Sequence, residues 1–99
     1  MISKTDIKQL SWLSTKKGRN ESDLYLIEGL RIIRSALRAQ APINRIFVTA
    51  RFQESIDYQS MSNRFNKVLK PELIDEKTMK QITQTVTPSG ILAVCSLPK

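Results

Sequence analysis

The 99-residue sequence has no histidine and only one cysteine, Cys95. Without histidine there is no Ser-His-Asp or Cys-His catalytic machinery, and one thiol supports neither an internal disulfide nor a Cys/His metal cluster. Cys95 stands in an apolar run, which indicates an unreactive core residue. Its solitary thiol fits a reducing, cytoplasmic compartment. The composition therefore argues against most enzymes and predicts no metal site.

Long apolar runs are also missing, and so is a leader-like N-terminus. No window approaches the roughly 18 apolar residues of a membrane span, so we expect a soluble, unexported protein. The length and the 40% apolar content suit one domain over residues 1–99 with one modest core.

Acidic side chains are scarce in the first half of the chain. Residues 1–51 carry ten basic and four acidic side chains, a net charge of +6, whereas the remainder is near neutral at +1. Such asymmetry is typical of a surface that meets a polyanion, because each neutralised phosphate releases condensed counterions. A merely soluble basic protein would show the same charge, so both interpretations stay open.

Apolar spacing, caps and breakers predict strands that alternate with helices. The first helix is expected at about 5–15, where Ser3 opens a capping box and Gly18 is the stop, and the second runs from Leu30 to Ala41-Pro42. A third helix is weakly indicated within 51–66; its lining residues are Phe52, Ile56, Met61 and Phe65. A fourth helix follows an N-cap at Asp75. The strands are expected at 23–28, 45–49, within 67–74 and at 91–96. This order predicts a three-layer α/β/α sandwich with a small, mostly parallel or mixed sheet.

Two groups of cations are candidates for binding. Lys16, Lys17 and Arg19 are expected on a loop beside a helix C-terminus, where they either reach phosphates or merely complement the helix dipole. Arg31, Arg34 and Arg38 are expected on the helix face opposite the apolar residues. That stripe is either a ligand contact or a solvated face.

Two separated motifs resemble a known family. The sequence KKGR at 16–19, LYLIEG at 24–29 and the Arg-containing helix that follows are similar to the N-terminal substrate-binding domain of the SpoU/TrmH family of RNA ribose 2′-O-methyltransferases. The sequence TPSGILA at 87–93 resembles the closing motif of that domain. The resemblance covers roughly residues 4–97 and implies an RNA-binding domain, similar in fold to small ribosomal RNA-binding proteins.

The resemblance also implies what lies outside this sequence. A methyltransferase domain that binds S-adenosylmethionine is expected C-terminal to residue 99, so this chain alone should catalyse nothing while the full protein is an enzyme. The implied partner is structured RNA, ribosomal RNA being favoured over transfer RNA, and the full protein is expected to form a homodimer through its catalytic domain. The sequence is either an excised domain or a natural solo domain. An adaptor that binds an acidic protein, or RNA without catalysis, is the alternative function.

A structural loop motif is expected to shape the loops of the domain; its residues are Glu28, Gly29, Thr87, Pro88 and Gly90. Glu28 ends a predicted buried strand, and it either pairs with Arg31 or Arg19 or accepts from a ribose hydroxyl. Gly29 and Gly90 are expected to supply positive φ or close approach. The Asn-Glu pair that grips a kink-turn in the ribosomal relatives is missing at this junction, which argues against kink-turn recognition.

Aromatic side chains are few. Trp12, Tyr25 and Phe47 are predicted to fill the core, which leaves three loosely assigned rings for base stacking, Phe52, Tyr58 and Phe65. No basic and aromatic residues interleave as they do in a base-stacking module. RNA recognition is therefore expected to depend on backbone shape and charge. The RNA is expected to dock on the loop at 16–19 and on the neighbouring start of the helix that begins at Leu30.

Overall fold

A four-stranded sheet forms the middle layer of the computed structural model, which describes residues 2–61, 70–83 and 88–96. The strands lie in the order β1 (Leu24–Glu28), β4 (Ile91–Ser96), β2 (Ile43–Val48) and β3 (Glu72–Leu73). β4 runs antiparallel to both of its neighbours, whereas β2 and β3 pair in parallel. The mixed sheet, one of the two arrangements expected, is confirmed, because β4 inserts between β1 and β2 and runs against both.

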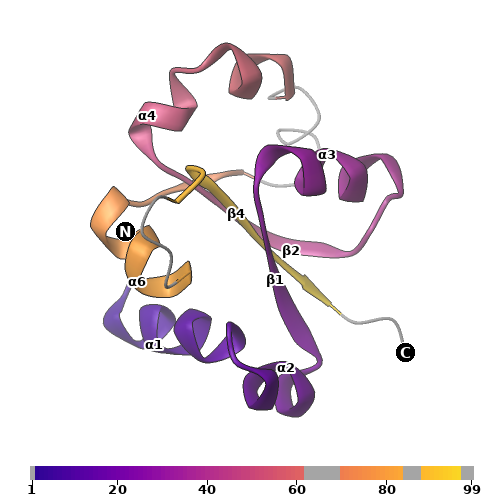
Figure 1. Ribbon diagram of the computed structural model, residues 1–99, viewed down its shortest axis with the longest axis vertical. Helices are drawn as coiled ribbons and strands as arrows, with labels where there is room; N and C mark the ends of the chain where they lie inside the picture. The colour runs from indigo at the N-terminus through magenta and orange to yellow at the C-terminus, as the bar shows by residue number, and fades with distance from the viewer. Residues whose placement is uncertain (1, 62–69, 84–87, 97–99) are drawn as a thin grey trace.

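Helices cover both faces of the sheet and give the three expected layers (Figure 1). One face packs against α1 (Lys4–Leu13) and α6 (Glu76–Thr83), and the other packs against α3 (Leu30–Arg38) and the helical residues 56–61. Along β4, Leu92 and Val94 face the first pair of helices, while Ile91 and Ala93 face the second. This alternation is the two-residue period of a strand that is buried on both faces.

Strand β1 lies at the edge of the sheet and not in its interior. All five of its residues are half-buried, so the buried strand predicted for 23–28 is confirmed in place but wrong in burial. The fully buried strand is β4, which has a neighbour on each side. Length and composition do not distinguish the two, because both segments are short and apolar.

Gly18 does not end the first helix, contrary to the sequence prediction. α1 already ends at Leu13, and a second helix, α2 (Lys16–Ser22), begins after Thr15, whose Oγ1 accepts a hydrogen bond from Gly18 N at 3.1 Å. Gly18 is buried against the Trp12 carbonyl, which a Cβ at Gly18 would approach to 2.0 Å. The expected loop is therefore a helix, and Trp12 packs over it with 36% of its surface exposed, not in the core.

The second half of the chain follows the predicted order of elements. α4 (Ala50–Gln53) opens the connection after β2, and β3 falls inside the range 67–74. Asp75 caps α6 as predicted, accepting a hydrogen bond from Thr78 N at 2.6 Å. Within 51–66, Ile56 was expected to line the helix but is 83% exposed, whereas Tyr58 is buried; Phe65 lies outside the described residues.

Candidate nucleic-acid interface

The two sequence motifs meet at one end of the sheet. Because β1 and β4 are antiparallel, the end of β1 lies beside the start of β4. Ser89 N donates to Glu28 Oε2 at 3.2 Å, and Gly29 N donates to Ile91 O at 3.2 Å. The Glu28 carboxylate thus accepts a hydrogen bond from the backbone of the second motif, whereas an arginine or a ribose hydroxyl was the expected partner. Its role in the structure is to hold the end of β1 to the turn that precedes β4.

Both glycines of the loop motif have the predicted positive φ. Gly29 has φ +106° with open space where a Cβ would lie, and Gly90 has φ +95° with Phe52 Cβ only 2.8 Å from that position. Gly29 is therefore required for backbone conformation, and Gly90 for conformation and close approach. Pro88 is half-buried beside Gly90, whereas Thr87 lies outside the described residues.

The predicted cations of residues 16–19 are carried by α2. Lys16 and Lys17 are exposed in its first turn, where the dipole of the helix disfavours cations, so dipole complementation within this helix does not account for them. Arg19 lies in the last turn, half-buried, and its Nη1 donates to Ser14 O at 3.2 Å. Among the described parts of the chain no side chain or carbonyl engages Lys16 or Lys17, so these two members of the group can meet a ligand.

Arg31 and Arg38 of α3 are exposed, as the predicted outer face requires. Arg34 directly follows the fully buried Ile33 and is half-buried, so it lies at the border of that face. The neighbouring Ile32 is 53% exposed. The stripe is therefore open to a ligand.

These two groups of cations are not neighbours, contrary to the sequence interpretation. α2 precedes β1 and α3 follows it, so the groups lie at opposite ends of that strand (Figure 1). A strand of five residues separates its ends by about 15 Å. The candidate interface is thus two cationic surfaces that flank the edge strand β1, because Lys16 and Lys17 belong to a helix and not to a flexible loop.

Arg45 is held by ion pairs with two carboxylates of the protein. Arg45 Nε and Nη2 donate to the two carboxylate oxygens of Glu72 at 2.8 and 2.6 Å, and Arg45 Nη1 lies 3.5 Å from Asp6 Oδ1. The Glu72 hydrogen bond raises the pKa of Arg45. This arginine joins β2, β3 and α1 and is not available to a polyanion.

Sequence reasoning counted Arg51 only as part of the net charge and missed its position. Arg51 follows the end of β2 by three residues, as Arg31 follows the end of β1, and this repeated spacing was the available signal. Arg51 lines a hollow of about 380 Å³ at the loop-motif end of the sheet; the other residues are Thr49, Phe52, Ser55, Glu76, Pro88, Ser89 and Gly90.

Tyr58, a predicted stacking ring, is buried and packs edge-on to Phe52 with ring centroids 6.2 Å apart.

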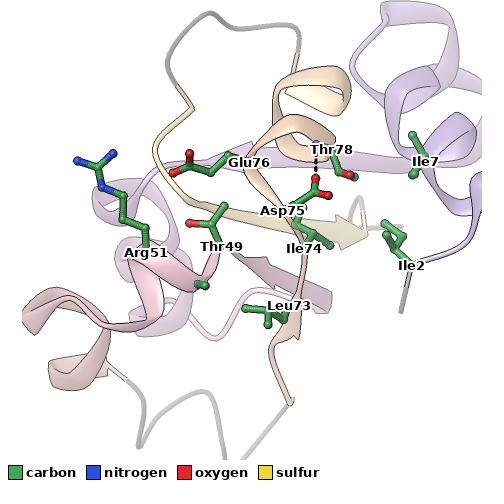
Figure 2. A pocket seen from close by; sticks show the side chains of 10 residues that line it. Ile2, Ile7, Thr49, Arg51, Leu73, Ile74, Asp75, Glu76 and Thr78 are labelled. Carbon is green, nitrogen blue, oxygen red and sulfur yellow. Dashed lines mark hydrogen bonds between the residues drawn. The ribbon is translucent and has the colours of Figure 1, made fainter.

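A larger hollow of about 660 Å³ shares Thr49, Arg51 and Glu76 with the first (Figure 2). Figure 2 shows Ile2 and Ile7 on one side of it, and Arg51 and Glu76 on the other. The carboxylates of Asp75 and Glu76 line it, and the hydrogen bond from Thr78 lowers the pKa of Asp75. Two carboxylates and an aliphatic wall do not favour a polyanion, so we place no RNA contact there.

The chain offers little catalytic chemistry. Cys95 is fully buried in β4, and burial raises the pKa of its thiol, which makes it a poor nucleophile. In residues 2–61, 70–83 and 88–96, no group of three or more Cys, Asp or Glu side chains could hold a metal ion. Within the same ranges no helix has the length and apolar character needed to span a membrane.

Together these features define a class: a small α/β/α domain with cationic helices flanking an edge strand. The chain belongs to the family of MRM3-like substrate binding domains, whose family profile matches residues 4–93. The resemblance to the N-terminal domain of SpoU/TrmH RNA 2′-O-methyltransferases is thereby confirmed.

Relatives agree with this assignment. The chain is 27% identical over 93 residues to the 23S rRNA (guanosine(2553)-2′-O)-methyltransferase RlmP of Bacillus subtilis, covering 94% of this chain and 35% of the relative. A crystal structure of an RNA 2′-O ribose methyltransferase shares 25% identity at a TM-score of 0.80, covering 98% of this chain and 36% of that one.

The same fold occurs in more distant structures. An rRNA methyltransferase from Sinorhizobium meliloti matches with a TM-score of 0.75 and 17% identity, over 99% of this chain and 36% of that one. AviRb of Streptomyces viridochromogenes, a SpoU methyltransferase in complex with S-adenosylmethionine, matches with a TM-score of 0.74 and 16% identity, over 98% and 37%. The chain spans about a third of the length of each of these relatives.

Proposed function

We propose that this chain is the RNA-binding, substrate-recognition domain of an S-adenosylmethionine-dependent RNA ribose 2′-O-methyltransferase. The observation that carries the proposal is the family match over residues 4–93. The relative named as a 23S rRNA methyltransferase favours ribosomal over transfer RNA as the substrate. The comparisons give no support to the alternative of an adaptor for an acidic protein.

In this proposal the RNA backbone follows the β1 edge of the domain, from Lys16 and Lys17 on α2 to α3. The two ends of β1 lie about 15 Å apart, the length of a five-residue strand. A nucleic-acid duplex carries about one phosphate charge per 1.7 Å of axis, so several phosphates face that span. The binding energy is electrostatic and largely independent of sequence.

The chemistry belongs to a methyltransferase domain C-terminal to this one in the same protein, and that domain also carries the proposed homodimer contact. S-adenosylmethionine supplies the methyl group, which the 2′-hydroxyl of one ribose accepts. The residues of this chain bind and orient the RNA. Fixing the geometry of a bound substrate lowers the free-energy barrier of the reaction, because the translational and rotational entropy is lost in the binding step and not in the reaction step.

Salt-dependent RNA binding tests the role of α2. The probe is a fluorescent RNA stem-loop, titrated with the purified protein between about 50 and 200 mM salt. Because each phosphate contact contributes about 0.7 to 0.9 to the slope of log affinity against log salt, Lys16→Ala with Lys17→Ala should lower the affinity and reduce that slope by one to two units. The melting temperature should stay nearly unchanged, since both side chains are exposed.

The matched control is Lys77→Ala with Lys80→Ala, which also removes two exposed lysines, from α6. α6 covers the sheet face opposite α3. This control should have less effect on RNA affinity than the α2 variant. Equal effects of the two double variants would contradict the assignment of RNA to the β1 edge.

A further inference from the structure

A small pocket opens between α3 and the helical residues 56–61. Its volume is about 150 Å³, and it is lined by Arg34, Leu37, Arg38, Ser60 and Met61. Met61 is buried and Leu37 is half-buried, and they are the apolar part of this lining. The pocket therefore combines three side chains that donate hydrogen bonds with two apolar ones.

The two arginines of this pocket carry like charges one helical turn apart. Residues separated by four positions are neighbours on a helix, and like charges there repel each other. Among the described residues no carboxylate lies within ion-pair distance of Arg34 or Arg38, because the ion pairs found there join Arg45 to Asp6 and Glu72. An anion between the two guanidinium groups would remove this repulsion.

The donors around the pocket suit a phosphate group. Each guanidinium presents a planar fork of N–H donors that matches two oxygens of a phosphate. Ser60 Oγ donates to Asp57 O at 2.8 Å, and this exposed hydroxyl can rotate toward a ligand as a third donor. The apolar side chains of Leu37 and Met61 lower the local dielectric and strengthen the attraction between guanidinium and phosphate.

We propose that this pocket binds one phosphate of the RNA backbone, held by Arg34 and Arg38 with Ser60 as the third donor. The inference rests on the proposed function for the identity of the ligand, whereas the pocket itself rests on the geometry. Arg31 lies one turn earlier on the same helix but does not line the pocket. It is thus a matched control with the same charge and chemistry.

Affinity for the RNA stem-loop measures the contribution of each arginine. Arg34→Gln and Arg38→Gln should each weaken binding about tenfold, the equivalent of one charge-assisted hydrogen bond. Arg31→Gln should weaken it less than threefold, as expected for loss of a screened surface charge. Equal losses in the three variants, with the wild type binding, would overturn the pocket and leave the proposed function standing.

Ser60→Met provides an independent variant that changes no charge. Ser60 is exposed, so the variant should fold with a nearly unchanged melting temperature while the longer side chain fills the pocket. RNA affinity should fall by about as much as in Arg34→Gln. Unchanged affinity in Ser60→Met would overturn the pocket even if an arginine variant were to unfold.

A titration with inorganic phosphate separates the pocket from its RNA ligand. The arginine Nε–Hε resonances of Arg34 and Arg38 should shift with phosphate, while that of Arg31 should not, and the RNA stem-loop should displace the phosphate. If the protein binds phosphate but the RNA does not displace it, the proposal that the pocket binds a phosphate of the RNA backbone is wrong. Failure of the wild-type protein to bind any RNA would overturn the proposed function and, with it, that ligand.

Discussion

Replacing Gly18 by alanine should destabilise the domain, although alanine is normally the better helix former. In an exposed helix interior Gly→Ala stabilises by about 1 kcal/mol. Here the new Cβ would lie 2.0 Å from the Trp12 carbonyl oxygen and 2.7 Å from its carbon. Since close C···O contacts in proteins lie at about 3.3 Å or more, the backbone of α1 or α2 must move by over 1 Å.

That movement disturbs a carbonyl already engaged by two donors. Trp12 O accepts from Thr15 N at 3.0 Å and from Thr15 Oγ1 at 2.6 Å. Overpacking costs about 1–3 kcal/mol, and each weakened hydrogen bond adds about 1 kcal/mol. After subtracting the gain in helix propensity, the net loss is about 2–4 kcal/mol. For a domain of 99 residues this lowers Tm by about 10–25 °C.

Urea unfolding followed by far-UV circular dichroism measures this loss, and the fluorescence of Trp12, the only tryptophan, reports on the contact itself. Asn20→Ala, at an exposed position of the same helix, is the control and should leave stability unchanged or slightly raised. Gly29→Ala measures the cost of backbone strain without a steric clash, because φ is +106° there but no atom lies within 4 Å of a new Cβ. A Gly18→Ala protein as stable as the wild type would refute the reasoning.

Two further predictions concern titratable groups. The pKa of Asp75 is lowered in the folded state by its hydrogen bond from Thr78, so its contribution is fully present above the unfolded pKa near 4 and is lost as pH falls through the folded value. The Tm difference between wild type and Asp75→Ala should therefore be largest at neutral pH and shrink below about pH 4; a difference that does not vary with pH would contradict the cap. Cys95 is fully buried with a raised pKa, so a thiol reagent at pH 8 should react only after urea unfolding, and rapid labelling of the native protein would contradict its burial.

The order of elements could be predicted from the sequence because each element carries its own local signal. Asp75 is an N-cap followed by Met79 and Ile82 at helical spacing, and all three occupy the predicted positions. The segment 91–96 is a continuous apolar run and is the buried central strand. These signals come from residues within one or two turns of each other, which a sequence displays directly.

Features that depend on distant contacts could not be predicted in the same way. Gly18 has the sequence character of a helix stop, but its role is to allow a close approach to Trp12. β1 is only half-buried because it lies at the edge of the sheet, and its one neighbour, β4, follows it by more than 60 residues in the sequence. Strand direction has no local signal either, since Leu24–Glu28 and Ile91–Ser96 are both short apolar segments.

The cationic residues of the candidate site were named from the sequence, whereas their arrangement was not predicted. Arg31 and Arg38 of α3 are exposed as predicted, whereas Arg34 directly follows the buried Ile33 and is half-buried. Lys16 and Lys17 were assigned to a loop next to that helix, but α2 holds them at the other end of β1. The pocket that contains Arg34 and Ser60 joins residues from two helices, so neither segment indicates it alone.

The central proposal is tested most directly on the native gene product, isolated from its own cells with an antibody raised against this domain. The isolated protein is incubated with labelled S-adenosylmethionine and unmodified ribosomal RNA, and the RNA is digested with alkali. We predict a product larger than this 11.3 kDa chain by at least one domain, and label retained in an alkali-resistant dinucleotide, the mark of a 2′-O-methyl group. A product of about 11.3 kDa that binds RNA but transfers no methyl group would contradict the account.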